Sequence, residues 1–179
     1  DIIVEEATRL NAIITDFINF ARPRSPKLSP CRVDDVIEKT LAFLTSQLAD
    51  RGYTVEKICQ NPLPDIMGDA PLLHQSFLNL FINAMQAMPD GGRIGVGLRA
   101  EGARVRIEIE DAGQGIPADL LDKIWNPFFT TKDKGTGLGL GIVKNIVEAH
   151  GGTIHIANRE LQGARVTIDL PARTAEGNA

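Results

Sequence analysis

Residues 111–141, DAGQGIPADLLDKIWNPFFTTKDKGTGLGLG, constrain the fold most, because two glycine clusters bracket a stretch without a long apolar run. The first cluster begins at Asp111, directly after a strand-like run, and the second ends at Gly141, where a helix-like run begins. Glycine permits positive φ and close backbone approach, and the start of a helix offers unpaired N–H groups to an anion. The segment therefore predicts a lid that closes over a phosphate.

Known phosphate-binding motifs do not account for this segment. A P-loop needs Gly followed by Lys, and the chain contains no such pair. In the dinucleotide fingerprint, Leu140 or Ile142 would stand where the third glycine belongs, and FFTTKDK is a poor preceding strand. The protein-kinase signature set is also missing. There remains a glycine-rich lid carrying Lys132 and Lys134, with a plain solvated connection as the alternative.

A helix is predicted from Asp69, as its N-cap, to about Met88, with Pro71 tolerated in its first turn. The helix is apolar almost all round, which predicts that it is buried. One polar row nevertheless recurs at helical spacing: Gln75, Asn79, Asn83 and Gln86. An unpaired buried amide costs about 1–3 kcal/mol, so the row must face a partner. That partner is either backbone within the core or a ligand with a hard cation such as Mg²⁺.

The first 22 residues predict a helix with a heptad seam formed by Ile3, Ala7, Leu10, Ile14, Phe17 and Ala21. The seam indicates either a stem that packs on other helices or an amphipathic helix lying on its own domain. Because the pattern is already under way at the first residues, we expect a preceding helix in a longer protein. Prolines in RPRSPKLSP predict a stiff linker over residues 23–30.

The remaining pattern predicts helices over residues 34–50, with an aspartate at the N-cap, and over residues 141–150. Strands are expected at the ranges 53–59, 93–100, 104–111, 153–158 and 164–170, the last four as two hairpins. NPLPDIMGD is expected to be a loop, and the tail from Ala172 to be disordered. Without regular βαβ units, an α+β fold follows, with a mixed, mostly antiparallel sheet and helices on one face.

Charge, apolar runs and cysteine spacing argue against nucleic-acid binding, against a membrane span and against a cysteine metal site. A net charge of −4 argues against a sequence-independent nucleic-acid footprint. The sequence contains neither an apolar run of about 18 residues nor a signal peptide. Cys31 and Cys59 lack metal-ligand spacing, so we interpret them as reduced thiols of a cytoplasmic chain.

Four motifs in order resemble the catalytic domain of bacterial sensor histidine kinases. They are the asparagines at 79 and 83 on a helix, DAGQGI at 111–116, NPFFTTK at 126–132 and GTGLGLG at 135–141. The resemblance covers residues 29–171, RLNAIITDFINFARP looks like the end of a dimerisation stem, and FFTTK and VEAHGG are most similar to the nitrogen-regulator type. It implies the two-layer α/β sandwich of GHKL ATPases, with ATP and Mg²⁺ as cofactors.

By that resemblance, Asp111 would hydrogen-bond the exocyclic amine of adenine. Asn83 would hold Mg²⁺, with Asn79 near the same phosphates, and Lys132 could reach the γ-phosphate, so Asn79 and Lys132 are the catalytic candidates. The other implied nucleotide-binding residues come from the three remaining motifs: Gly113, Gly115, Ile116, Phe128, Thr131, Gly135, Thr136, Gly137, Leu138, Gly139 and Leu140. Phe129 would help Phe128 to anchor the lid.

Asn79 also bears on the reaction type. Related ATPases carry a glutamate four residues before the metal-binding asparagine, and the amide here has no basicity to activate water. Transfer of the γ-phosphoryl group to a protein histidine is therefore favoured over hydrolysis. The alternatives are a GHKL-type ATPase, an anti-sigma-like serine kinase and a non-catalytic nucleotide-sensing adaptor.

The chain departs from the family at three points: Gln86 replaces a basic residue, Ala164 replaces a hydroxyl residue after Gly163, and no histidine precedes an acidic residue. We therefore expect the acceptor histidine to lie outside this sequence, and His74, His150 and His155 to be structural or surface residues. The implied partners are the kinase's own stem helices in a homodimer and the receiver domain of a response regulator. The full-length protein could be membrane-anchored. The expected units are a stem (1–22), a linker (23–30), a catalytic domain (31–171) and a tail (172–179).

Overall fold

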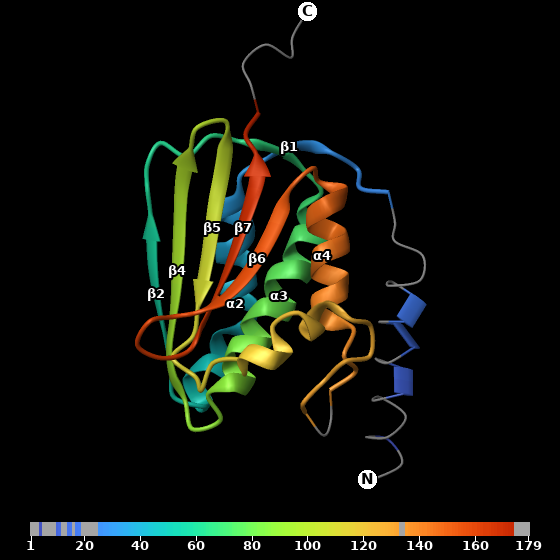
Figure 1. Ribbon diagram of the computed structural model, residues 1–179. Helices are drawn as coiled ribbons and strands as arrows, with labels where there is room; N and C mark the ends of the chain where they lie inside the picture. The colour runs from blue at the N-terminus through green and yellow to red at the C-terminus, as the bar shows by residue number, and fades with distance from the viewer. Residues whose placement is uncertain are drawn as a thin grey trace, which may run out of the picture.

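The computed structural model describes residues 25–132 and 135–173, and also Val4, Leu10, Asn11, Ile14, Thr15, Phe17 and Ile18 (Figure 1). The larger elements occur in the order β1 (Ser29–Cys31), α2 (Val33–Asp50), β2 (Tyr53–Cys59), β3 (Ile66–Gly68), α3 (Ala70–Ala87), β4 (Gly92–Glu101), β5 (Arg104–Glu110), α4 (Gly139–Ala149), β6 (Thr153–Asn158) and β7 (Ala164–Pro171). Two short 3₁₀ helices, η1 (Ala118–Leu120) and η2 (Lys123–Trp125), lie between β5 and α4.

Five strands form one mixed sheet in the order β2-β4-β5-β7-β6. β2 is parallel to β4, and the other neighbours are antiparallel. Alternation along β5 explains its position: Val105, Ile107 and Ile109 are buried on one face, while the residues between them are only partly covered. The predicted mixed, mostly antiparallel sheet is confirmed.

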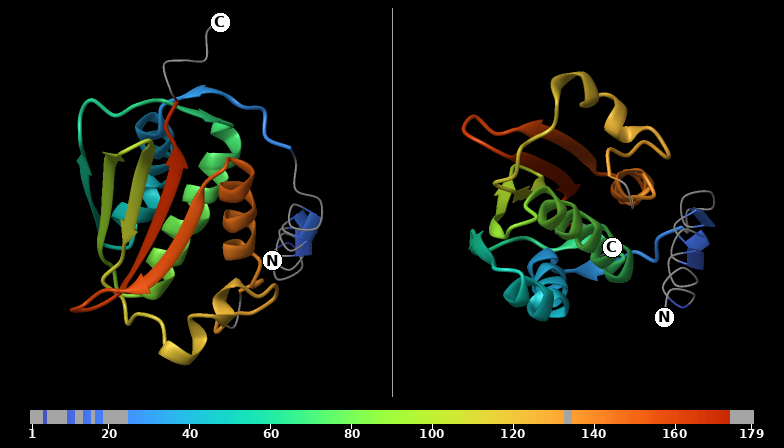
Figure 2. Two further views of the ribbon diagram at one scale, coloured as in Figure 1. Left: turned by 45° about the horizontal axis from the view of Figure 1, so that its top comes forward. Right: turned by 90° about the horizontal axis from the view of Figure 1, so that it is seen from below.

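The helices α2, α3 and α4 lie on one face of this sheet, with α3 between the other two (Figures 1 and 2). The main core lies between the two layers and includes Ile37, Phe77, Phe81, Ile107 and Leu170. The opposite face of the sheet carries cross-strand ion pairs, among them Arg99 with Glu108 at 2.5 Å and Arg106 with Asp169 at 2.7 Å. This confirms the predicted two-layer α+β sandwich.

Two segments predicted to be irregular contain strand. The last residues of the predicted linker join β1, which pairs antiparallel with β3 inside the predicted loop NPLPDIMGD. Ala172, predicted to begin a disordered tail, forms a bridge with Ile66, and its N–H donates to the Ala103 carbonyl at 2.9 Å. These predictions were wrong because pairing between distant segments supplies hydrogen bonds that local composition does not reveal. Residues 174–179 lie outside the described part of the chain.

Helix boundaries also differ from the predictions. The N-cap of α2 is Arg32, without a side-chain cap, and Asp34 lies in the first turn, where it accepts from Arg32 at 2.7 Å. This ion pair lowers the pKa of Asp34. α4 begins at Gly139, two residues earlier than expected. The predicted cap of α3 is confirmed, since the Asp69 carboxylate accepts from the Leu72 N–H at 3.2 Å.

Part of the predicted seam near the N-terminus lies among the described residues. Leu10, Ile14 and Phe17 are helical and about half-exposed, with 57%, 53% and 49% of their surface accessible. Ile3, Ala7 and Ala21 lie outside the described residues. Among the helices that the structure describes, none is long and apolar enough to span a membrane. Cys31 and Cys59 are free thiols, and burial raises the pKa of Cys31.

Candidate functional site

The polar row of α3 faces outward rather than into the core. Gln75, Asn79 and Asn83 are partly exposed and Gln86 is exposed, whereas the opposite side of the helix, with Phe77 and Phe81, is buried. The predicted burial of α3 is confirmed for its apolar side, and the polar row is the part of the helix that is not buried. In a single helical layer α3 has neighbours on two flanks and the sheet beneath it, which leaves its fourth side open. The polar row occupies that open side.

Lys132 of the lid reaches this row. Its Nζ donates to Asn83 Oδ1 at 3.2 Å and to Gln86 Oε1 at 2.6 Å. Much of the residue is exposed, but the ammonium lies against α3, and this desolvation lowers the pKa of Lys132 while the charge of Asp111 opposes the shift. Three chain segments thus bring a cation, two amide oxygens and a carboxylate into electrostatic reach of one another.

Asp111 follows the end of β5, at the same end of the molecule as the lid (Figure 1). Its Oδ1 accepts from the Gly113 N–H at 2.9 Å and from the Ala164 N–H at 3.2 Å. Its own N–H donates to the Ala164 carbonyl at 3.0 Å, and its carbonyl accepts from Arg159 at 3.0 Å. The Oδ1 atom of Asp111 therefore accepts from two backbone N–H groups. The second carboxylate oxygen, Oδ2, takes part in none of the hydrogen bonds described for residues 25–132 and 135–173.

The first glycine cluster packs directly on the end of α3. A Cβ on Gly113 would lie 2.5 Å from the Ala87 carbonyl oxygen, so only glycine fits there. The adjacent Ala112 N–H points at Met88 Sδ, 3.2 Å away. This close packing places Asp111 near the C-terminal turns of α3, where Asn83 and Gln86 are found.

The start of the lid is tied to β6 by a side chain that sequence reasoning missed. Asn158 accepts from the Ile116 N–H at 2.7 Å and donates to the Ile116 carbonyl at 2.7 Å. A Cβ on Gly115, where φ is +77°, would meet Asn158 Oδ1 at 2.9 Å. Gly163 and Arg159 were also missed as supports of Asp111. A single asparagine at the end of a strand has no sequence signature that would have shown this role.

Phe128 closes the lid loop through its backbone. It has a positive φ of 65°, and its N–H donates to the Gly137 carbonyl at 3.1 Å. A Cβ on Gly137, itself at φ +68°, would lie 2.4 Å from the Phe128 carbonyl carbon. The exposed Phe128 ring stacks on Phe17 near the N-terminus, with centroids 6.3 Å apart. Phe128 and Gly137 therefore bring the NPFFTTK motif against the second glycine cluster.

The second glycine cluster leads into α4, as predicted. Leu138 is fully buried against Ile142 and Ile146 and is the N-cap of α4, without a side-chain cap. Its side chain lies in the core, so only its backbone groups can face a ligand. Leu140 is partly buried and packs on the main core. A Cβ on Gly139 would meet nothing within 4 Å, so the start of α4 leaves space beside its uncapped N–H groups.

The remaining predicted lid residues organise turns. Thr136 Oγ1 accepts from the Leu138 N–H at 3.3 Å, and a Cβ on Gly135 would clash with Thr130 Oγ1 at 2.4 Å. Thr131 is exposed, and no hydrogen bond links it to the polar row among the described residues. Lys134 lies outside the described residues.

A single tryptophan attaches the lid to α4. The Lys144 ammonium lies 5.7 Å from the centroid of the Trp125 ring, which belongs to η2. The same ammonium lies 4.0 Å from Glu148. The middle of the lid is thus packed on α4 rather than on the polar row of α3.

A magnesium ion is compatible with this chemistry. The described residues contain no group of three or more histidine, cysteine or acidic side chains placed to hold a metal ion. Mg²⁺ commonly binds through one or two protein oxygens together with phosphates and water, so it needs no such cluster. Asn83 Oδ1 is a hard oxygen that already faces a cation. The residues present therefore fit a metal held mainly by a substrate.

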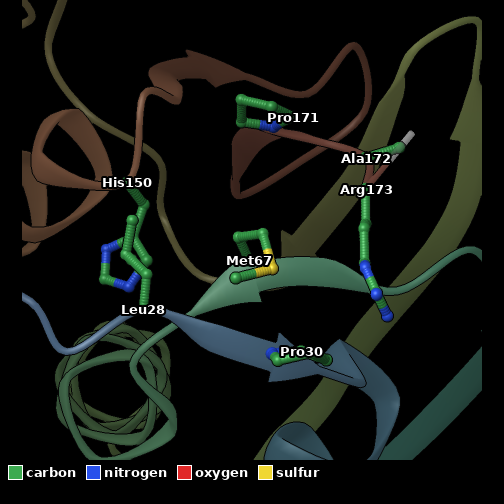
Figure 3. Close-up of a pocket in the computed structure, with 7 residues that line it drawn as sticks. All are labelled: Leu28, Pro30, Met67, His150, Pro171, Ala172 and Arg173. Atoms are coloured by element: carbon green, nitrogen blue, oxygen red, sulfur yellow. The ribbon is translucent and has the colours of Figure 1, made fainter. Parts of the chain in front are cut away.

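A pocket of about 410 Å³ lies beside β1 and the end of β7, at the end of the molecule away from the lid (Figure 1), and Figure 3 shows the residues that line it. Leu28, Met67, His150 and Pro171 line it, and none of the predicted site residues does. Both ring nitrogens of the buried His150 are engaged: Nε2 accepts from the Asp69 N–H at 2.9 Å and Nδ1 lies 2.7 Å from the Ile146 carbonyl. This confirms the structural interpretation of His150.

The described hydrogen bonds of the other two histidines do not include the polar row. His74 Nδ1 lies 2.8 Å from Thr40 Oγ1 on α2, and His155 is exposed on β6. Both agree with the predicted structural and surface positions.

Known proteins resemble this chain in sequence and in structure. Sensor histidine kinase ZraS of Escherichia coli strain K12 is 39% identical over 170 residues, which are 95% of this chain and 37% of that protein. Sporulation kinase A of Bacillus subtilis strain 168 is 33% identical over 174 residues, 97% of this chain and 29% of that protein. The chain therefore spans only 29% to 37% of the length of these two curated relatives.

Solved structures of histidine kinases are also similar to this chain. Full-length ShkA in complex with AMPPNP has a TM-score of 0.85 at 27% identity, covering 96% of this chain and 37% of that one. Histidine kinase ThkA in complex with response regulator protein TrrA has a TM-score of 0.82 at 26% identity, covering 96% and 50%. Residues 68–174, more than half of the chain, match the family described as histidine kinase-, DNA gyrase B- and HSP90-like ATPase. The chain belongs to that family.

Proposed function

We propose that this chain binds Mg-ATP and transfers the γ-phosphoryl group to a histidine on the stem helices of a two-component sensor kinase. The observation that carries the proposal is the meeting of Lys132 with Asn83 at the end of α3 where Asp111 also lies. The similarity to sensor histidine kinase ZraS and to ShkA in complex with AMPPNP supports it.

Asp111 would recognise adenine. Its Oδ1 is held by two backbone N–H groups, so the carboxylate is fixed before a ligand arrives. The second carboxylate oxygen would accept a hydrogen bond from the exocyclic amine. Gly113 and Gly115 would let the backbone pass close to the nucleotide, with Ile116 beside them.

The phosphates would lie between α3 and the start of α4. Asn83 would hold Mg²⁺ with Asn79 one turn earlier, and the bound metal would neutralise charge on the phosphate oxygens. Lys132 would face the γ-phosphate. The backbone from Leu138 to Leu140 at the start of α4, with Gly135, Thr136, Gly137 and Gly139, would face the phosphate chain, because a helix N-terminus attracts anions.

Phe128 would anchor the lid, and Thr131 would lie beside Lys132 in it. Phosphoryl transfer asks the protein chiefly for positioning and charge neutralisation, so these residues suffice without a nucleophile of their own. The Asn79 amide cannot act as a base toward water, which favours a protein acceptor over hydrolysis. None of the three histidines precedes an acidic residue, so we place the acceptor elsewhere in the full-length protein.

The same proposal extends to organisation and partners. Residues 1–22 would belong to the stem of a homodimer and 31–171 to the catalytic unit, to which residues 29–30 of β1 and the bridge at Ala172 also belong. The half-exposed seam residues Leu10, Ile14 and Phe17 would pack on other stem helices. The phosphoryl group would pass to a response regulator, as the ThkA complex with TrrA suggests. The unit would act in the cytoplasm, consistent with its free thiols.

Calorimetry with AMPPNP and Mg²⁺ tests the proposal, using Asp111→Asn and the control Asp119→Asn, an exposed aspartate of η1. Asparagine keeps one oxygen for the backbone but replaces the outward oxygen by NH₂, which cannot accept from adenine. We expect a loss of affinity of about tenfold or more for Asp111→Asn and no change for the control.

Incubation with labelled ATP should leave no acid-labile phosphate on this chain. Absence of binding heat in the parent, or an unchanged affinity in Asp111→Asn, would refute nucleotide binding at this site. Brisk hydrolysis without transfer to a stem histidine would favour the ATPase alternative instead.

A further inference from the structure

Gln86 is the nearer of the two amides that hold the Lys132 ammonium. The distance from Nζ to Gln86 Oε1 is 2.6 Å, against 3.2 Å to Asn83 Oδ1. Asn83 and Gln86 are three residues apart on α3 and so lie on the same face of the helix. A side chain from the lid thus bridges to residues 46 and 49 positions away in the sequence.

The partners of this ammonium among the described residues are neutral. No ion pair is described for Lys132 within residues 25–132 and 135–173, and the carboxylate that acts on it, Asp111, does so from beyond contact. An amide oxygen orients an ammonium without cancelling its charge, whereas a carboxylate would neutralise it and a basic residue would repel it. Glutamine at this position therefore holds a cation whose full charge stays available to an anionic ligand.

The backbone of Lys132 is held equally well on the lid side. Its N–H donates to Thr130 Oγ1 at 3.1 Å, and its carbonyl accepts from the Gly135 N–H at 3.1 Å. The side chain therefore extends toward α3 from a backbone held by Thr130 and Gly135, and its far end is fixed by Gln86. Asn83 can turn its oxygen to another cation without releasing the ammonium into solvent, because Gln86 supplies a second acceptor.

We propose that Gln86 is a positioning residue that keeps the Lys132 ammonium beside Asn83, so that the lid delivers the cation that meets the terminal phosphate. The proposal deepens the proposed function and rests on it. In this proposal Lys132, held by Gln86, supplies the positive charge that a basic residue at position 86 of α3 would otherwise supply. It also makes phosphate recognition depend on the position of the lid.

A double-mutant cycle tests this role. Gln86→Met, Lys132→Met and the double variant are compared with the parent by calorimetry, using AMPPNP with Mg²⁺ and separately ADP with Mg²⁺. Gln75→Met is the matched control, since it removes a glutamine from the same row of α3. Gln86→Ala repeats the test with a strong helix former, and thermal unfolding verifies that every variant is folded.

We expect Gln86→Met to weaken AMPPNP binding about three- to tenfold, the effect of losing one hydrogen bond of ordinary strength, because Asn83 still holds the ammonium. ADP binding should change less than twofold, because the ammonium is aimed at the terminal phosphate. The double variant should bind no more weakly than Lys132→Met alone, and Gln75→Met should match the parent.

Equal losses for Gln86→Met in the presence and absence of Lys132 would overturn the inference while leaving nucleotide binding intact. So would an equal loss of ADP and AMPPNP affinity, which indicates a general distortion of α3. A parent chain that binds neither nucleotide would refute the proposed function and the inference together.

Discussion

Single glycines in this molecule have different physical roles, although they look alike in the sequence. A Cβ on Gly163 would lie 2.0 Å from the Asp111 carbonyl oxygen, and its φ is +88°. A Cβ on Gly139 would meet nothing within 4 Å, and Gly139 starts a helix. Packing against Asp111 thus requires glycine at position 163. The fold does not require glycine at position 139, and the space beside it leaves room for a ligand.

Gly163→Ala should lower the free energy of unfolding by about 1–3 kcal/mol, because the left-handed backbone and the close approach both exclude a side chain. Gly139→Ala should leave stability unchanged or raise it by up to about 1 kcal/mol, as expected at the start of a helix. Urea denaturation of the two variants measures the contrast. Equal stabilities would show that the contact between Gly163 and Asp111 is not tight.

At the scale of elements, Asp69 joins three parts of the fold. Its carboxylate caps α3 through the Leu72 N–H and also accepts from the Lys27 N–H at 2.8 Å. Its own N–H donates to His150 at the end of α4. The end of α3 farthest from the polar row is therefore tied to the segment before β1 and to the neighbouring helix.

Asp69→Ala should lower the free energy of unfolding by about 1–2 kcal/mol, the cost of losing an N-cap. Asp122 provides a control, because it stands at the N-cap of η2 without a side-chain cap bond. Asp122→Ala should therefore have little effect in the same denaturation experiment. A loss at Asp122 as large as that at Asp69 would argue against capping as the cause.

At the scale of the molecule, the residues of the core and the predicted site residues lie in different parts of the two-layer fold. The core lies between the sheet and the helices, where Ile107 of the central strand β5 is fully buried. The predicted site residues lie at one end of the layers, where β5 and α3 end and α4 begins (Figure 1). Edge positions such as Ile58 of β2 remain 68% exposed.

Ile107→Ala should cost about 2–5 kcal/mol of unfolding free energy, because it leaves a cavity in the middle of the core. Ile58→Ala removes the same atoms from an exposed edge and should cost less than about 1 kcal/mol. Differential scanning calorimetry of both variants gives the comparison. Similar losses would mean that β2 is covered in solution.

Periodicity was sufficient for most elements of the fold. The alternation in residues 104–110 and the cap at Asp69 predicted β5 and α3 correctly, since both signals are local. β1, β3 and the bridge at Ala172 were missed because their hydrogen-bond partners are distant in the sequence. The N-cap of α2 was misplaced because Asp34 pairs with Arg32 instead of capping.

The sequence by itself determined the order of the helices α2, α3 and α4 and of the strands of the main sheet, the polar row on α3 and the glycine-rich lid, because spacing and backbone freedom are properties of neighbouring residues. Only the tertiary structure decided that the row faces outward, that Asn158 and Gly163 hold the segment around Asp111, and that Lys132 meets Gln86. These contacts depend on how separate segments pack, and no local pattern encodes which side chains that packing brings together.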